Sequence, residues 1–154
     1  MLQFRLFGFP VSVHAFFWLT VALLGGIDSA TTPRGMQALL GWVVVAFVSV
    51  MIHELGHAFT MRHFGDRYVT IMLYAFGGAA QPSRAMPRKE SFIISAAGPF
   101  FQIAAAVVVW WLMDFWQPEH WLAATMLEQF VDISVFWAVL NLAPIIPLDG
   151  GATL

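Results

Sequence analysis

The sequence contains no cysteine and very little charge. Without cysteine no disulfide can form and no thiolate can bind a metal, so His, Asp and Glu remain as the strong ligands. Charged residues make up 10% of the chain, whereas soluble domains contain about 25%. Only seven residues are Lys or Arg and the formal net charge is -2, so no basic surface for nucleic acid is available and we exclude that partner. The apolar share of 60% indicates a membrane protein that lies in a lipid bilayer.

Four apolar segments are predicted to cross the membrane as helices. They cover residues of about 10–27, 36–64, 91–113 and 121–142. The first could also be a cleaved signal peptide, but Asp28 stands where a small residue should precede cleavage, so we expect a retained helix. The expected fold class is an all-α polytopic membrane protein with about four transmembrane helices and the start of a further one. A single domain over residues 1–154 is expected.

The polar connection at residues 62–90 carries most of the positive charge. Together with the N-terminal lead it holds six of the seven Lys and Arg residues. Positively charged loops stay in the cytoplasm, so the N-terminus and this loop are predicted to be cytoplasmic. Within residues 65–82, the segment YVTIMLYAF is rich in β-branched and aromatic residues and stops at Gly77-Gly78. This pattern predicts a small β-strand or hairpin.

The second apolar segment contains the sequence HELGH at residues 53–57. His53 and His57 lie four residues apart, so on a helix both imidazoles can bind one metal ion while Glu54 reaches its open position. Zinc bound by histidine nitrogens, beside a carboxylate that accepts a proton from water, is the zincin arrangement. A helix that starts at residue 36 places His53 about 25 Å along its axis. We therefore predict one Zn²⁺ per chain, on the cytoplasmic side within the bilayer.

A catalytic zinc ion needs a third protein ligand. His63 has the metzincin spacing from His57, but Thr60 replaces the glycine that would turn the chain back. On a continuous helix His63 is rotated by about 120° from His57, so an interfacial histidine is the better interpretation. Glu90 in the basic loop is a further possibility.

Asp149 is the favoured third ligand. It lies in the segment NLAPIIPLDGG, residues 141–151, where two prolines break the helix and two glycines permit a tight turn. An aspartate at this depth costs roughly 2.5 to 3.5 kcal/mol unless it has a partner, and a zinc ion is a suitable one. The alternative is a solvated aspartate in a turn at the inner surface.

The two motifs together resemble those of the site-2 protease family, the intramembrane zinc metalloproteases. The resemblance covers nearly the whole chain, and weaker similarities are found in FPVSVH at residues 9–14, AFGG at 75–78 and AGP at 97–99. It implies that His53, His57 and Asp149 bind zinc and that Glu54 is the general base. It also implies that Asn141 helps to bind or polarise the scissile carbonyl.

Three other features bear on the resemblance. Gln102 stands where the family usually has Asn, which keeps an amide but lengthens its reach, and we do not count it as a site residue. Family members generally continue past the position of Leu154, so a shortened chain is one interpretation. His14 could approach the site, but a hydrogen-bonded histidine at a helix end is the simpler interpretation.

The predicted function is hydrolysis of a peptide bond in or near a transmembrane segment of a membrane-protein substrate. Gly77, Gly78 and Ala79 would receive the unwound substrate by strand addition, although a loop that only covers the cytoplasmic mouth is the alternative. A catalytically silent scaffold is argued against by the intact Glu54. A metal-handling membrane protein is disfavoured because one ligand triad provides no series of sites across the bilayer. The residues carry no signal for the oligomeric state.

Overall fold

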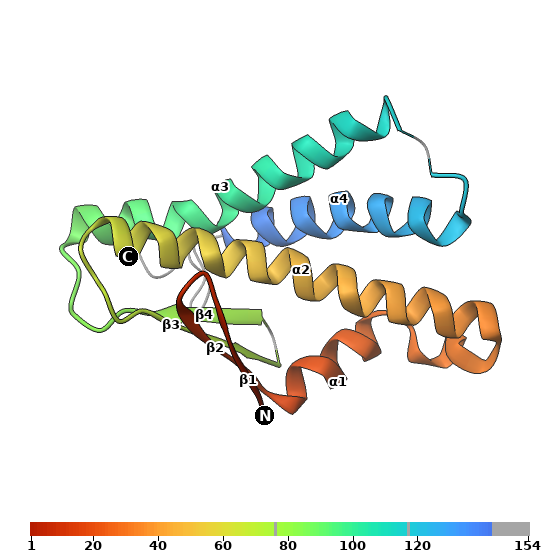
Figure 1. Cartoon of the computed structure of the whole chain (residues 1–154), viewed down its shortest axis with the longest axis horizontal. Helices are drawn as coiled ribbons and strands as arrows, with labels where there is room; N and C mark the ends of the chain where they lie inside the picture. Colours follow the sequence, from red (N-terminus) through yellow and green to blue (C-terminus); the bar gives the residue numbers. More distant parts are fainter. Residues whose placement is uncertain (76, 117, 143–154) are drawn as a thin grey trace.

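The fold consists of a helical bundle with a small sheet on one side (Figure 1). It is a computed structural model that describes residues 1–75, 77–116 and 118–142. The helices are α1 (Ala15–Leu24), the 3-10 helix η1 (Ile27–Thr31), α2 (Pro33–His63), α3 (Arg88–Met113) and α4 (Trp121–Asn141). Helix α2 packs against α3 and α4 and also against the sheet, so it occupies the centre of the molecule.

Within the described residues, three helices, α2, α3 and α4, are long and apolar enough to cross a membrane. Helix α2 has 31 residues, about 46 Å at 1.5 Å per residue, which exceeds the hydrocarbon core of about 30 Å. The bounds of these helices agree with the predicted segments at 36–64, 91–113 and 121–142 to within three residues. Helix α2 begins earlier than predicted because Pro33 occupies its first position and Thr32 Oγ1 accepts a hydrogen bond from the Gly35 amide at 3.0 Å.

The prediction of one helix over residues 10–27 is wrong. Strand β2 (Phe9–Val13) occupies its first part, and α1 has only ten residues, about 15 Å. Phe9, Val11 and Val13 are buried while the residues between them are not, which is the period of a half-buried strand. The interpretation of His14 as a helix-end residue is confirmed, because it caps α1 and its Nδ1 accepts from the Phe16 amide at 3.4 Å.

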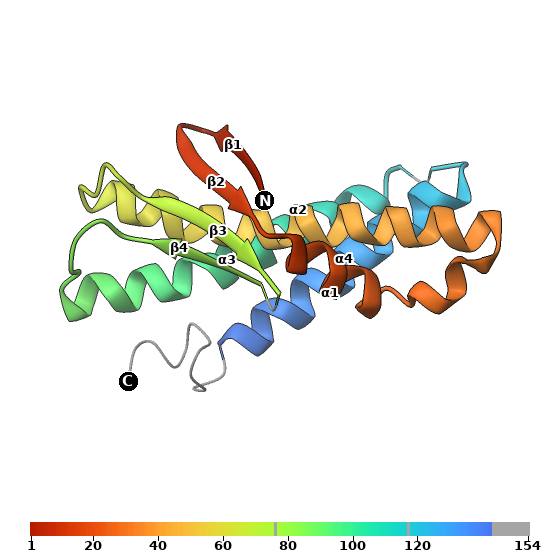
Figure 2. The ribbon, with the colours of Figure 1, turned by 90° about the horizontal axis from the view of Figure 1, so that it is seen from below.

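The sheet joins the N-terminal lead to the basic loop. Its order is β1-β2-β3-β4, with β1 (Leu2–Leu6), β3 (Thr70–Tyr74) and β4 (Gly77–Gln81). The outer pairs are antiparallel, whereas β2 and β3 are parallel. Strands β3 and β4 confirm the hairpin predicted within residues 65–82, and the β1–β2 hairpin was not predicted. Figure 2 shows the sheet along one side of the long helices.

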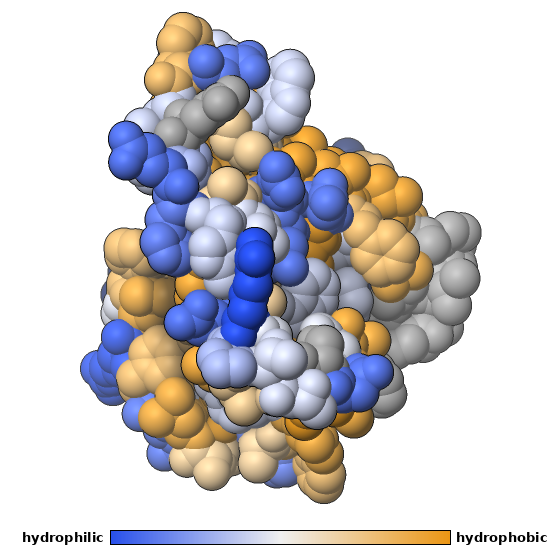
Figure 3. Space-filling model, turned by 90° about the vertical axis from the view of Figure 1, so that its right-hand side faces the viewer, coloured by the Kyte–Doolittle hydropathy of each residue, from blue (hydrophilic) through white to orange (hydrophobic). Residues whose placement is uncertain are grey.

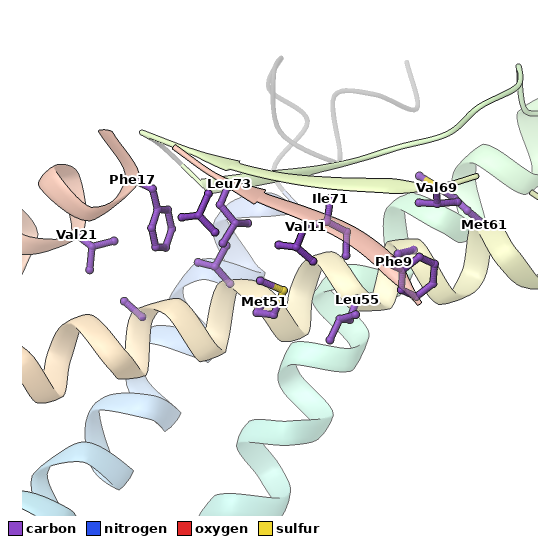
Figure 4. Packing of buried hydrophobic residues seen from close by; sticks show 14 of the residues in the cluster. Phe9, Val11, Phe17, Val21, Met51, Leu55, Met61, Val69, Ile71 and Leu73 are labelled. Carbon is purple, nitrogen blue, oxygen red and sulfur yellow. The ribbon is translucent and has the colours of Figure 1, made fainter. Parts of the chain in front are cut away.

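The apolar core lies between the sheet and α2. Figure 4 shows side chains from β2 and β3, among them Val11 and Leu73, which point toward Met51 and Leu55 of α2. The end of the bundle where α2 begins is shown in Figure 3, with hydrophilic residues at its centre and apolar ones around them. One face of α2 is therefore fixed by the sheet, and another is left to contact α3 and α4.

Candidate metal centre

The two histidines of the HELGH sequence meet on one face of α2. His53 and His57 are 2% and 5% exposed, and their Nε2 atoms lie 3.0 Å apart. The spacing of four residues brings the rings onto successive turns of the helix, with centroids 4.8 Å apart. Both nitrogens are thus directed at one shared position.

The other ring nitrogen of each histidine faces an oxygen. His57 Nδ1 lies 2.7 Å from the backbone carbonyl of Ile94, and His53 Nδ1 lies 2.9 Å from Gln102 Oε1. A carbonyl oxygen can only accept, so each Nδ1 donates its hydrogen to that oxygen, and the Nε2 atoms are the ones that face each other. Metal-binding histidines are held in this way by their second nitrogen.

Two glycines make room for this pair. A Cβ atom on Gly98 of α3 would overlap the Nε2 atoms of His57 and His53. A Cβ atom on Gly56 of α2 would lie 2.7 Å from the carbonyl oxygen of Ala97. Small residues therefore let the backbones of α2 and α3 approach each other beside the two nitrogens.

Glu54 lies between the histidine helix and the sheet. It is 3% exposed, and a Cβ atom on Gly78 would lie 2.5 Å from its Cγ and Oε1 atoms. Glu54 and His57 line a cavity of about 360 Å³, which Gly78 and Ala79 of β4 and Ser95 of α3 also line. The carboxylate, one histidine and the last strand of the sheet therefore share one space.

The remaining predicted residues are placed as follows. Asp149 and most of the 141–151 segment lie outside the described residues, and within the described part no three His, Cys, Asp or Glu side chains could hold a metal. Asn141 ends α4, and its Nδ2 donates to the Trp137 carbonyl at 2.9 Å. His63 is exposed at the end of α2, and Glu90 lies 3.5 Å from Arg84.

The histidine nitrogens on α2 are suited to bind a zinc ion. Two imidazoles whose Nδ1–H groups donate to oxygen atoms can offer their Nε2 atoms to a metal, and imidazole nitrogens are common zinc ligands. Their separation of 3.0 Å permits both to bind one ion at the usual zinc–nitrogen distance of about 2.0 to 2.1 Å. Glu54 adds a carboxylate in the adjoining cavity.

Gln102 is the residue that the sequence analysis missed. Its side chain is completely buried and connects His53 to Ser49. The available signal was an amide inside an apolar span, three residues after Pro99 of the Gly-Pro pair. Its contact could not be derived because the reach of a glutamine across two helices depends on how closely they pack.

The fold and the site define a membrane protein with a buried HExxH histidine pair inside its helical bundle. The sequence model of peptidase family M50 matches residues 41–132. The chain belongs to that family, the site-2 protease family that its motifs resemble.

Individual relatives agree with this assignment. The chain is 27% identical over 151 residues to a zinc metalloprotease of Methanocaldococcus jannaschii, covering 98% of this chain and 43% of that protein. It is 33% identical over 147 residues to the stage IV sporulation protein FB of Bacillus subtilis, covering 94% and 46%. The chain thus spans less than half the length of these two relatives.

A solved structure has the same fold. The site-2 protease from Methanocaldococcus jannaschii matches with a TM-score of 0.74 and 24% identity, covering 99% of this chain and 68% of that one. The arrangement of the described helices and strands is therefore one already observed in a protein of this family.

Proposed function

We propose that the chain is an intramembrane zinc metalloprotease that hydrolyses a peptide bond in or near a transmembrane segment of a membrane-protein substrate. The observation that carries the proposal is the buried pair of Nε2 atoms, 3.0 Å apart in a membrane-spanning helix. His53, His57 and Asp149 would hold one Zn²⁺. The ion would supply a water of lowered pKa and polarise the peptide carbonyl.

Glu54 is proposed as the general base. Its carboxylate lies in the same cavity as His57, within the space that a water molecule and a peptide must enter. A carboxylate there can take the proton of the attacking water and deliver it to the leaving amine. Burial at 3% exposure keeps bulk water away from this proton transfer.

The substrate is proposed to bind as an added strand. A helical peptide bond is shielded by its own hydrogen bonds, so the substrate must be unwound before hydrolysis. Strand β4 is an edge of the described sheet, and Gly78 and Ala79 line the cavity beside Glu54. A segment that pairs with the edge at Gly77, Gly78 and Ala79 would bring its backbone to the carboxylate. Asn141, by the family resemblance, would help to bind the scissile carbonyl.

The experiment is a Glu54→Gln variant of the purified protein, compared with wild type in metal analysis and in cleavage of candidate single-span proteins. We expect wild type to contain one zinc ion per chain. The variant should keep the zinc and lose cleavage, because the amide cannot accept the proton. Glu128→Gln, an exposed glutamate of α4, is the matched control and should cleave normally.

The outcomes separate the possible functions. Wild type that binds no metal would exclude a metalloprotease. Wild type that binds zinc and cleaves none of the candidate substrates, with no difference from Glu54→Gln in cells, would indicate a membrane-protein scaffold of the same fold. Fragments identified by mass spectrometry would give the cleaved bond directly.

A further inference from the structure

A line of buried polar side chains crosses the bundle and ends on His53. Ser134 Oγ of α4 lies 2.8 Å from Ser49 Oγ of α2, and Gln102 Nε2 of α3 donates to that Ser49 oxygen at 2.8 Å. Gln102 Oε1 then faces His53 Nδ1 at 2.9 Å. Ser49, Gln102 and Ser134 are all completely buried. Three membrane-spanning helices therefore contribute to the orientation of one imidazole.

The direction of the hydrogen bonds follows from the acceptors. Gln102 Nε2 also faces the Ser49 carbonyl at 3.4 Å, and a carbonyl cannot donate. The amide is therefore turned so that its oxygen, and not its nitrogen, faces His53. Ser49 Oγ accepts from Gln102, which leaves its own proton available for Ser134.

The two histidines differ in what holds them. His57 Nδ1 donates to a backbone carbonyl, which no side-chain substitution removes. His53 Nδ1 donates to a side chain, so its tautomer depends on Gln102. If the amide oxygen were absent, the hydrogen could move to Nε2, and the lone pair of that nitrogen would no longer be available to a metal ion.

We propose that Gln102, held by Ser49 with Ser134 behind it, is a positioning residue that fixes the Nδ1–H tautomer and ring orientation of His53. The inference rests on the proposed function, because it requires that His53 binds the metal. An outer partner of this kind contributes about 10- to 100-fold to metal affinity. The longer reach of glutamine lets one side chain contact His53 and Ser49 on the same helix.

The test measures the metal affinity of the purified chain, by competition with a chromophoric chelator, and the visible spectrum of the Co²⁺-loaded protein. Gln102→Leu keeps the volume and removes the acceptor, so affinity should fall by about 10- to 100-fold and the Co²⁺ spectrum should change. Gln102→Glu restores an acceptor for His53 Nδ1 and should recover most of the affinity. Ser49→Ala should cause a smaller loss in the same direction.

Gln129→Leu is the matched control. Gln129 lies on α4 five residues before Ser134, about 7.5 Å further along the axis, and its replacement should leave metal affinity and the spectrum unchanged. Circular dichroism reports whether each variant folds; if Gln102→Leu does not, Ser49→Ala decides. Wild-type affinity in the folded Gln102→Leu or Ser49→Ala variant, or an equal loss in Gln129→Leu, would overturn the inference while leaving the proposed function intact. A wild-type chain without metal would instead overturn the proposed function.

Discussion

Two backbone positions beside the histidines have no room for a methyl group. At Gly98 a Cβ atom would overlap the two Nε2 atoms, and at Gly56 it would press on the Ala97 carbonyl. The two sites therefore differ in what an added methyl would displace. At Gly98 it would occupy the position toward which the nitrogen lone pairs point, whereas at Gly56 it would separate two helices.

Replacing Gly98 by Ala is expected to weaken metal binding in a folded protein. The added methyl competes with the ion for space, and we expect zinc affinity to fall by at least about tenfold, the effect of disturbing a neighbour of a metal ligand. Metal analysis after dialysis measures this.

Gly41→Ala is the control for this change. Its Cβ atom would lie 3.1 Å from Met126 Cγ, the side chain there is flexible, and metal affinity should be preserved. A Gly98→Ala protein that binds zinc as tightly as wild type would contradict the geometry of the site.

Asp66 is a buried carboxylate at the end of α2, outside the membrane-spanning helices. It is 1% exposed, and it accepts from the Ser83 hydroxyl and amide at 2.6 Å and from the Tyr68 amide at 3.0 Å. The Ser83 hydroxyl is the largest cause that holds the pKa of Asp66 below its ordinary value of 3.8, against the opposing effect of desolvation. These bonds tie the segments before β3 and after β4 together.

The lowered pKa of Asp66 predicts a dependence of stability on pH. Because the folded pKa lies below 3.8, the stabilisation is complete above that value and is lost as pH falls through the folded pKa. The midpoint of thermal unfolding in detergent should therefore decrease toward low pH. In Asp66→Asn it should be lower at neutral pH and fall less on acidification. Parallel curves for the two proteins would show that Asp66 does not carry the effect.

At the residue scale, the sequence predicts those features of the site that depend only on the spacing of residues along one helix. The positions of His53 and His57 on one helical face follow from four residues of separation. The bond from Gln102 to His53 depends instead on the distance between α2 and α3, which the contact of Gly56 with Ala97 sets. That distance between the helices cannot be predicted from a local sequence pattern.

At the scale of the elements, the proposed addition of a substrate strand to the edge of β4 can be tested by crosslinking. The chain contains no cysteine, so a single Cys with a photoreactive label reports one position. A label at Ala79→Cys, beside the cavity, should crosslink to a bound substrate if the substrate adds to this edge. Gln3→Cys lies on β1, at the opposite edge of the same sheet.

The matched position, Gln3→Cys, should give no crosslink under the same conditions. Equal crosslinking at both edges, or crosslinking confined to the connection between α3 and α4, would argue against strand addition. The Glu54→Gln variant is the suitable background, because it should retain the uncleaved substrate.

The sequence predicted correctly those elements whose position depends on a single local signal. The spans at α2, α3 and α4 followed from long apolar runs. The run that contains β2 is equally apolar, but its fold is decided by pairing with β3, far along the chain. The turn of the β1–β2 hairpin lies at Phe7-Gly8, and this dipeptide was the local sequence signal for it. In the structure both residues have positive φ angles, of 50° and 85°. Phenylalanine is uncommon at such a position, so the turn was not predicted.

The pairing of β2 with β3 also constrains the whole molecule. Paired strands lie on one side of the membrane, so the N-terminal hairpin and the basic loop share a side. Six of the seven Lys and Arg lie in these two parts, and we predict that this side is cytoplasmic. The connection between α3 and α4 would then face the opposite side.

A membrane-impermeant thiol reagent on intact cells tests this orientation with the single-cysteine variants Gln3→Cys, Tyr68→Cys and Glu119→Cys, all at exposed positions. Glu119→Cys should react in intact cells, and the other two only after the cytoplasmic face is opened. Reaction of Gln3→Cys and Tyr68→Cys from different sides would contradict the sheet. Reaction of both from outside would contradict only the orientation.

The parallel pair has a consequence for the order of events during synthesis. Strand β2 leaves the ribosome long before β3, because α1 and α2 lie between them in the chain. The edge of β2 that pairs with β3 therefore stays without this partner until α2 has been inserted. Strand β4, which lines the space beside Glu54, pairs with β3 at the edge of the described sheet. A nascent chain thus carries His53 and His57 on α2 before β4, which lines the space beside Glu54, has been synthesised, and the proposed third ligand, Asp149, follows later still.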